Sequence, residues 1–497
     1  MKPTKLFLLP VISFFNVSSL TAQTMTWDNE FSFPGEDLGF FTKIIQSDSK
    51  NLLLAAYMEF GWFEYSPGLM KIDTNGNQIW AKAYDFIDSY QMITKTLVEI
   101  PDDSIYYSFC FDPSWPVPIK TNRREDLVNE CRLLKFNSVG DTLTSYYYTD
   151  IGWVNDLIYD EGFLIVAGGT NYEDEPWNFY SKPTIIVVDT SGNLIFRKEF
   201  FTDTNGRINS VIKKPDGDYY VVGSTELHYD PGYYQPDRMF LMELDHDFNP
   251  VWTFVSDIQF SEGNKIIRCN DDSYAIIGDG YNISSNNQDI LLWKINSDTL
   301  IDPPWFYDIS HSDNASSIKQ TMDNGFIFCG SVIPQNSSFT SFFYMKINAE
   351  GIEEWHWNNN PFYHEAYDVL PGNSGYYVAG HGSGAKLVKT DLTGYGLETS
   401  LPDHSGIASH DILKVYPNPT EHHITIEFNL LTNCMNGSVE ILDIYARTIV
   451  EVHLTGEKKK MDIPVDNYCQ GLYLVRLVCN HHTIACAKFT ILGGSLK

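Results

Sequence analysis

Apolar strands and polar turns alternate in a repeating order along the first four hundred residues. Residues 71–80 read KIDTNGNQIW, in which an apolar stretch, a polar turn and a tryptophan follow one another. Near-copies return as LLKFNSVGDTL (133–143), IVVDTSGNLIF (186–196), LMELDHDFNPVW (241–252), LLWKINSDTLI (291–301), FYMKINAEGIEEW (343–355) and KLVKTDLTGYGL (386–397). Self-similarity at a spacing of roughly 50 residues indicates a repeat protein built from one recurring supersecondary unit.

A second recurring unit precedes each of these hairpins. Examples are DEGFLIVAGG (160–169), PDGDYYVVGS (215–224) and DNGFIFCGS (323–331), and a further apolar strand stands before them, as in INSVIKKPDG (208–217). Alternating apolar residues with many β-branched and aromatic side chains favour strands over helices. Each repeat therefore predicts four strands, A to D, with short A–B and C–D turns and longer B–C loops.

Seven such units predict an all-β fold, a β-propeller of about seven four-stranded blades, with six or eight blades as alternatives. MTWDNEFSF (25–33) looks like a strand D without its own repeat, so we expect it to complete the last blade and close the ring. The hairpin resembles the tryptophan-docking hairpins of secreted bacterial propellers. It is similar in layout to quinoprotein blades, whose D-x-x-x-G-x-x-x-W pattern is one residue longer, and differs from the sialidase Asp-box.

The C-terminal region carries different motifs and follows a polar linker at 397–411. Its short alternating strands, from ILKVYPNPTEHHITIEFNL (412–430) onwards, predict a small Ig-like β-sandwich over 412–497. It resembles the type A C-terminal sorting domain of the type IX secretion system, although Ala446 stands where that family usually has glycine. The matching sorting-motif residues are Tyr416, Pro417, Asn418, Pro419, Gly471, Tyr473 and Lys488. The resemblance implies the type IX machinery as a partner; an ordinary Ig-like accessory module is the alternative.

The N-terminus has the layout of a secretory signal peptide over 1–22. Lys2 and Lys5 precede an apolar stretch, Leu6 to Val17, and small or polar residues lead to Ala22. No later segment is long and apolar enough to span a membrane. With the sorting domain, this predicts a protein that is secreted or held on the outer-membrane surface of a Gram-negative bacterium. The propeller is then expected to occupy 23–396.

Composition narrows the class of ligand and cofactor. Lys plus Arg number 34 against 64 Asp plus Glu, a formal net charge of −30, which argues against nucleic acid as a partner. Eight cysteines form no C-x-x-C pair, so we expect no zinc site. No EF-hand spacing, phosphate-binding loop or G-x-S-x-G elbow occurs, and we expect no metal and no cofactor.

The variable B–C loops point to the binding surface. They open on one face of a propeller together with the D–A connections, whereas the stereotyped turns open on the other face. Function concentrates in such loops on rigid scaffolds, and exposed aromatic rings can stack on sugars or on a partner protein. The candidate ligand-binding residues are Trp62, Trp115, Tyr172, Trp177, Tyr229, Tyr233 and Tyr234. Some of these rings could instead pack the loops against the blade tops.

Carboxylates and histidines in the D–A connections supply weaker catalytic candidates. They are Asp203, Glu262, His311, Asp313, His364 and Glu365. Groups of this kind near a channel can act in general acid/base chemistry, but solvated loop charges are more common. We therefore expect a binding protein for a polysaccharide or protein ligand rather than an enzyme. The alternatives are an extracellular glycoside hydrolase or lyase that uses axial carboxylates, and a purely structural surface protein.

Overall fold

The predicted strands pair in chain order into antiparallel sheets, because short turns join neighbours whose alternate side chains are apolar. In the computed structural model the chain divides into two compact units, Met1–Leu397 and Glu398–Lys497. The structure describes residues 26–394 and 413–491 apart from gaps in connecting segments, the longest being 112–130, 227–236, 429–436 and 85–91. Among the described residues every regular element is a β-strand, and no helix has the length and apolarity to cross a bilayer.

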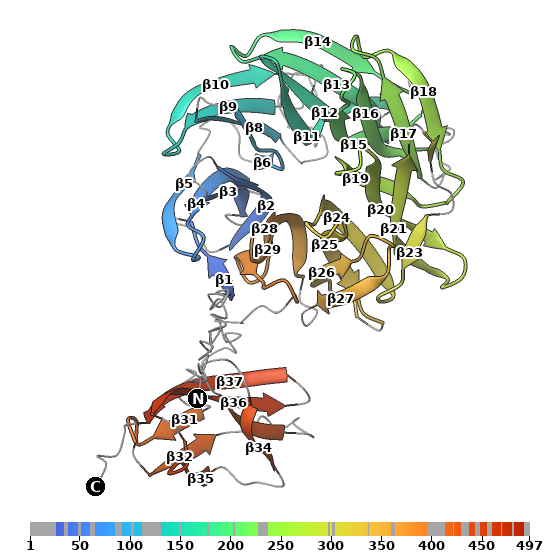
Figure 1. Ribbon diagram of the computed structural model, residues 1–497. Helices are drawn as coiled ribbons and strands as arrows, with labels where there is room; N and C mark the ends of the chain where they lie inside the picture. The colour runs from blue at the N-terminus through green and yellow to red at the C-terminus, as the bar shows by residue number, and fades with distance from the viewer. Residues whose placement is uncertain are drawn as a thin grey trace, which may run out of the picture. The chain divides into compact units, whose positions relative to one another are not determined.

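The first unit is a β-propeller whose sheets surround a common centre (Figure 1), as the sequence predicts. Its described residues form seven blades, because the one nine-stranded sheet divides into two blades joined by a single parallel pair, Gln288 opposite Ser312. The first blade contains β2 (Leu38–Gln46), β3 (Leu52–Glu59), β4 (Tyr65–Ile72) and β5 (Gln78–Ala83). The second contains β6 (Ile93–Thr94), β7 (Val98–Ile100), β8 (Ile105–Phe111), β9 (Cys131–Asn137) and β10 (Thr142–Tyr148). The third contains β11 (Trp153–Asp160), β12 (Phe163–Glu175), β13 (Asn178–Asp189) and β14 (Leu194–Glu199).

The remaining blades follow the same order. The fourth contains β15 (Gly206–Lys213), β16 (Tyr219–Thr225), β17 (Arg238–Leu244) and β18 (Pro250–Val255), and the fifth contains β19 (Glu262–Arg268), β20 (Tyr274–Asn282), β21 (Asn287–Asn296), β22 (Thr299–Leu300) and β23 (Trp305–Tyr307). The sixth contains β24 (Ser312–Gln320), β25 (Phe326–Ile333), β26 (Ser341–Ile347) and β27 (Glu353–Asn358). The seventh contains β28 (Glu365–Gly372), β29 (Gly375–His381), β30 (Ala385–Lys389) and β1 (Trp27–Phe31). The strand A of each blade lies nearest the axis.

The two ends of the propeller sequence meet in the last blade. β1 pairs antiparallel with β30, from Trp27 opposite Lys389 to Phe31 opposite Ala385. Asp28 and Lys386 form a buried ion pair at 2.8 Å across these strands. The prediction that the segment 25–33 closes the ring is confirmed, because β1 forms the outer strand of the last blade.

The recurring C–D hairpin holds each blade against the next. In KIDTNGNQIW, Asp73 Oδ1 accepts hydrogen bonds from the backbone N–H groups of Asn75 (2.9 Å) and Asn77 (2.8 Å), and Gly76 adopts a φ of +88° that favours glycine. A β-carbon on Gly140 would lie only 2.8 Å from the Trp80 ring of the preceding blade. The same docking places Tyr146 on Gly192, Trp305 on Gly351, Trp355 on Gly394 and, across the closure, Trp27 on Gly76.

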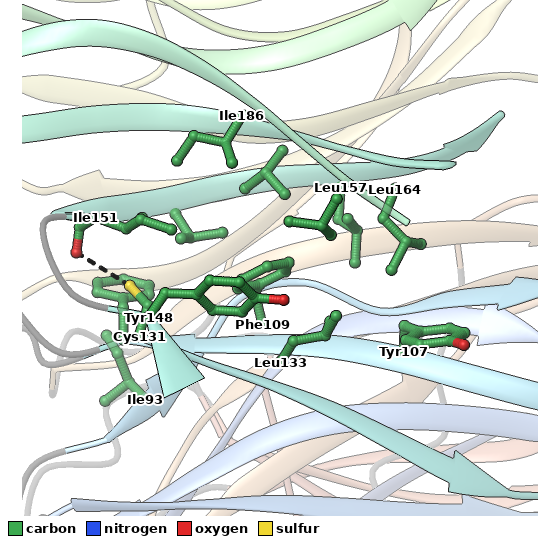
Figure 2. Packing of buried hydrophobic residues seen from close by; sticks show 14 of the residues in the cluster. Ile93, Tyr107, Phe109, Cys131, Leu133, Tyr148, Ile151, Leu157, Leu164 and Ile186 are labelled. Carbon is green, nitrogen blue, oxygen red and sulfur yellow. Dashed lines mark hydrogen bonds between the residues drawn. The ribbon is translucent and has the colours of Figure 1, made fainter. Parts of the chain in front are cut away.

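Apolar side chains fill the space between adjacent blades. Figure 2 shows the cluster between the second and third blades, where the rings of Tyr107, Phe109 and Tyr148 face Leu157, Leu164 and Ile186. The Cys131 thiol in this cluster donates to the Ile151 carbonyl at 3.1 Å. Burial on this scale, at about 25 cal/mol per Å² of apolar surface, is what holds the blades together.

The second unit packs two antiparallel sheets on one core. One sheet contains β31 (Leu413–Tyr416), β32 (His423–Phe428) and β35 (Lys460–Pro464), and the other contains β34 (Thr448–Leu454), β33 (Gly437–Leu442), β36 (Gly471–Cys479) and β37 (His482–Ile491). Ile424 and Ile426 from the first sheet meet Val475, Leu477 and Phe489 from the second, all buried. The apolar side chains at alternate positions of these strands therefore point into the core from both sheets.

Candidate functional site: the axial cavity

A cavity of about 450 Å³ lies at the propeller axis, lined by residues of the inner strands. Six of these strands carry a β-bulge, at which one residue has no partner in strand B. A bulge re-aims the extra side chain, and all six extra residues line the cavity. They are Thr42, Asn155, Asn209, Asn264, Ser316 and Tyr367. In the second blade Lys95 lines it from the break between β6 and β7.

A glycine in strand B accommodates five of these bulges. The bulge pushes the inner strand towards its neighbour, and a β-carbon on Gly223 would overlap the carbonyl oxygen of Arg207. The same overlap, in each case with an inner-strand carbonyl oxygen, recurs at Gly168, Gly278, Gly330 and Gly380. The glycine of the recurring VAGG, VVGS, IIGD, FCGS and VAGH segments is therefore required by the shape of the cavity wall.

The bulge asparagines link successive blades. Each one donates its side-chain amide to a backbone carbonyl of the inner strand in the next blade. The three bonds run from Asn155 to Ile208 (3.0 Å), from Asn209 to Gly263 (3.1 Å) and from Asn264 to Ala315 (2.9 Å). These residues therefore hold the cavity wall in shape as well as presenting amides to its interior.

Two buried aspartates anchor lysines within the cavity. Asp156 accepts from Lys265 Nζ at 2.6 Å and Ser210 Oγ at 2.8 Å, and Asp368 lies 3.3 Å from Lys43 Nζ. Burial alone would raise the pKa of both carboxyl groups, but the nearby lysines outweigh it and hold each pKa below its ordinary value. Both aspartates are therefore ionised at neutral pH.

Two of the lysines near these aspartates have lowered pKa values. Burial, together with the charges of Lys43 and Lys319, lowers the pKa of Lys265 to about 8 despite the opposing charge of Asp156. Lys319 also has a lowered pKa, from burial and then from Lys43. Lys319 is not among the residues that line the cavity, and the lining itself carries Lys43, Lys95 and Lys265 against Asp156, Asp368 and Glu365.

Lys95 is the exposed cation of the cavity. Among the described residues it forms no ion pair, and its side chain is open to the cavity space. The loss of solvation among the surrounding residues lowers the pKa of Lys95, and the charge of Arg207 lowers it further. The charges of Glu262 and Glu365 oppose that shift. Lys95 thus stands at the loop-rich end of the cavity within reach of the fields of these three groups.

A row of aromatic rings adjoins the cavity on its loop-rich side. The Phe40 ring stacks on Tyr57 at 4.6 Å and on His381 at 4.0 Å between centroids, and Tyr57 meets Tyr65 edge-on at 5.7 Å. All four residues are half-buried, and Tyr57 itself lines the cavity. This row joins the first and last blades. The sequence reasoning missed it, since Phe40, Tyr57 and His381 lie at strand ends rather than in the long loops.

The structure places the acidic catalytic candidates in separate contacts. Glu262 forms a two-pronged ion pair with Arg207, with N–O distances of 2.8 Å on each side, and also accepts from Asn209. Glu365 lines the cavity and accepts from the Tyr367 hydroxyl at 2.8 Å. Asp203 lies outside the described residues.

The remaining catalytic candidates are two histidines and one buried aspartate. His364 packs 6.3 Å from His381, and burial lowers its pKa to about 4. His311 is exposed, and its backbone N–H donates to Ile333. Asp313 is buried and accepts from two backbone N–H groups of its own connection. Among the described residues, neither His311 nor Asp313 forms a hydrogen bond or ion pair with Glu262 or Glu365.

Of the loop aromatics, only Tyr172 lies within the described residues. Its hydroxyl donates to Glu199, and Lys182 Nζ lies 4.4 Å from its ring centroid, so it packs on the outer part of its own blade. The other candidate residues lie outside the described residues: Trp62, Trp115, Trp177, Tyr229, Tyr233 and Tyr234. Their contribution to binding stays a prediction.

The sorting motif of the second unit is structured around Asn418. Its side chain brackets β37, donating to the Lys488 carbonyl at 2.9 Å and accepting from the Thr490 N–H at 3.0 Å. The peptide bonds before Pro417 and Pro419 are both cis. Tyr473 stacks on Phe489 at 5.6 Å in the core. The motif residues that are far apart in sequence therefore form one connected structure.

Residues 414–491 match the protein family described as the secretion system C-terminal sorting domain. This places the chain among proteins secreted to the cell surface or beyond it by the type IX system of Gram-negative bacteria. No curated protein matches the chain.

Solved structures similar to the first unit include a polysaccharide lyase of family PL25, an ulvan lyase (TM-score 0.47, 7% identity, covering 73% of this chain and 96% of that one). A luciferin-regenerating enzyme is also similar (TM-score 0.37, 12% identity, covering 62% and 94%). Likeness at this level carries no argument about activity, and the propeller fold rests on the strand pairing described above.

Proposed function

We propose that the exported propeller binds an acidic extracellular polysaccharide, with an anionic group of the sugar entering the loop-rich end of the axial cavity beside Lys95. The observation that carries this proposal is Lys95, an exposed lysine of the cavity that forms no ion pair among the described residues of an otherwise acidic protein. A carboxylate or sulfate on the ligand would supply the missing counter-charge, and an exposed lysine can bind it by a charge-assisted hydrogen bond.

The aromatic row supports a saccharide over a small inorganic anion. Tyr57 lines the cavity and is partly exposed, and an aromatic face with polar neighbours suits the amphipathic surface of a sugar. The amides of Asn155 and Asn209 line the same space and add donors and acceptors for hydroxyl groups. The loop aromatics predicted from the sequence would extend this contact outward on the same face.

The contacts of the acidic candidates favour binding over hydrolysis. A glycoside hydrolase needs two carboxyl groups flanking the scissile bond, one with a raised pKa. Glu262 is engaged by Arg207, and Glu365 by Tyr367. Each of these two carboxylates therefore already has a partner within the protein.

Isothermal titration of the mature chain with oligogalacturonate, and with dextran as a neutral glycan, tests the proposal. We expect saturable binding of the acidic glycan only, weakened about tenfold or more by Lys95→Gln. Lys82→Gln is the matched control, because Lys82 lies on an outer strand in a surface ion pair with Asp141 and its loss should leave affinity unchanged. Equal affinity for both glycans, or equal loss in both variants, would refute an anion site at Lys95.

A further inference from the structure

Three aspartates meet between the fifth and sixth blades, away from the axial cavity. Asp289 lies on β21, Asp313 on β24, and Asp308 in the connection between β23 and β24. The parallel pair Gln288–Ser312 brings the first two together, since each aspartate follows one member of the pair. One carboxylate oxygen of each aspartate lies within 4.8 Å of the others. All three stand at the ends of the blades that carry the B–C and D–A connections.

Two of these carboxylates are buried, and only one of the two oxygens in each accepts hydrogen bonds within the described residues. Asp289 and Asp313 are both 0% exposed, and Oδ1 of each has no hydrogen-bond partner among the described residues. A buried carboxylate oxygen without a partner is unfavourable unless a cation compensates the charge or the group takes up a proton. No lysine or arginine forms an ion pair with any of the three aspartates within the described part of the chain.

The second oxygen of each buried carboxylate is held in place. Asp289 Oδ2 accepts from Asn282 Nδ2 at 2.7 Å and Ser285 Oγ at 2.8 Å. Asp313 Oδ2 accepts from the N–H groups of Ile309 at 2.7 Å and Ser310 at 3.0 Å. Outer hydrogen bonds of this kind orient ligating groups in metal sites, and here they leave Oδ1 of each carboxylate for another partner.

From this geometry we infer that Asp289, Asp308 and Asp313 bind a Ca²⁺ ion that joins the fifth and sixth blades. Ca²⁺ takes oxygen ligands at about 2.3–2.6 Å, so ligands on opposite sides of it lie about 4.6–5.2 Å apart. The three carboxylate oxygens here lie within 4.8 Å of one another, which fits ligands around one such ion. Mg²⁺ requires shorter, strictly octahedral bonds and keeps more of its water. The site contains only carboxylate oxygens, which also disfavours zinc.

A second acidic cluster differs from the first because a lysine already neutralises its carboxylates. Asp216, Asp218 and Glu243 also gather within 4.8 Å. Lys214 Nζ already compensates them, at 3.1 Å from Asp216 and 2.5 Å from Glu243. Motif spacing could not have revealed the first site, because its ligands come from two blades. The sequence therefore predicted no metal there.

Calorimetric titration of the mature, EDTA-treated chain with CaCl₂ tests the inference. We expect one equivalent to bind in the range of about 0.1–1 mM typical of extracellular sites, with a rise in the melting temperature. Asp313→Asn should abolish both effects. Asp308→Asn removes an exposed ligand, leaves the buried pair intact and should weaken binding about tenfold. Asp216→Asn is the control and should bind as the wild type does.

Two results would overturn the inference: no heat and no thermal shift with CaCl₂ in the wild type, or unchanged affinity in Asp308→Asn. An equal response to MgCl₂ would overturn the choice of Ca²⁺. Because Asp308 is exposed, its variant keeps the test informative even where Asp313→Asn fails to fold. The outcome is independent of the saccharide proposal, whose ligand enters at the axis.

Discussion

Lys265 is the residue whose charge in the axial cavity is most easily changed near neutral pH. Its Nζ contacts Asp156, and the positive charges of Lys43 and Lys319 lie close enough to repel its own charge. Burial and these charges lower its pKa to about 8, against an ordinary value of 10.5. Asp156 and Asp368 remain ionised throughout this range, so the charge balance of the cavity there follows the lysines.

This shift predicts how ligand binding depends on pH. Below about pH 8 Lys265 is protonated; above it the proton is lost and the cavity becomes more negative. Affinity for an acidic glycan should therefore fall as pH rises from 7 to 9, measured by titration calorimetry. Lys265→Arg keeps its charge over the range and should flatten the profile. Identical profiles for the two proteins would rule out this role for Lys265.

At the scale of the element, the inner-strand bulge shapes the cavity. Strand alternation assigns successive side chains to opposite faces, but a bulge adds one residue and turns it towards the axis. In five of the six bulged blades the facing residue of strand B is a glycine, as at Gly223, which leaves room for the displaced carbonyl of Arg207; the first blade has Ala56 there. The same pairing recurs in five blades, so the bulge and the glycine act as one unit.

Gly223→Ala should therefore destabilise the propeller strongly. The new β-carbon would overlap the Arg207 carbonyl, and overpacking against backbone costs about 3 kcal/mol. Urea unfolding followed by tryptophan fluorescence measures the change in unfolding free energy. Gly384→Ala is the control, because only Phe31 O, at 3.5 Å, lies near its β-carbon position. Similar stabilities for the two variants would contradict this account of the bulge.

The strands and turns could be predicted from the sequence, whereas the cavity lining could not. Asp73, Gly76 and Trp80 carry local signals, because a turn is determined by residues close in the chain. The lining depends on bulges, which strict alternation cannot reproduce. Consecutive polar residues such as Asn155-Asp156 within an apolar strand were the signal that could have revealed them. The ion pairs of Asp156 with Lys265 cross blades and are set by tertiary structure alone.

At the scale of the whole molecule, each unit has its own task. The propeller closes through β1 and β30, which makes its ring independent of the second unit in strand pairing. The second unit carries the sorting motif, ordered through Asn418 and β37. Export and ligand binding should therefore be separable by truncation.

Deletion of residues 412–497 should leave the protein in the periplasm, because the type IX machinery would no longer recognise it. Cell fractionation with surface proteolysis of the full and truncated chains measures this. The truncated propeller should still bind oligogalacturonate as the full chain does. Its continued appearance at the cell surface would contradict the assignment of the sorting domain.

The most direct test of the axial site is a crystal structure of the propeller with bound oligogalacturonate. We expect a sugar carboxylate within about 3.2 Å of Lys95 Nζ, with an adjoining sugar ring against Tyr57 on the loop-rich side. A glycan bound on the opposite face, where KIDTNGNQIW and its relatives form their turns, or on the outer blade edges, would contradict it.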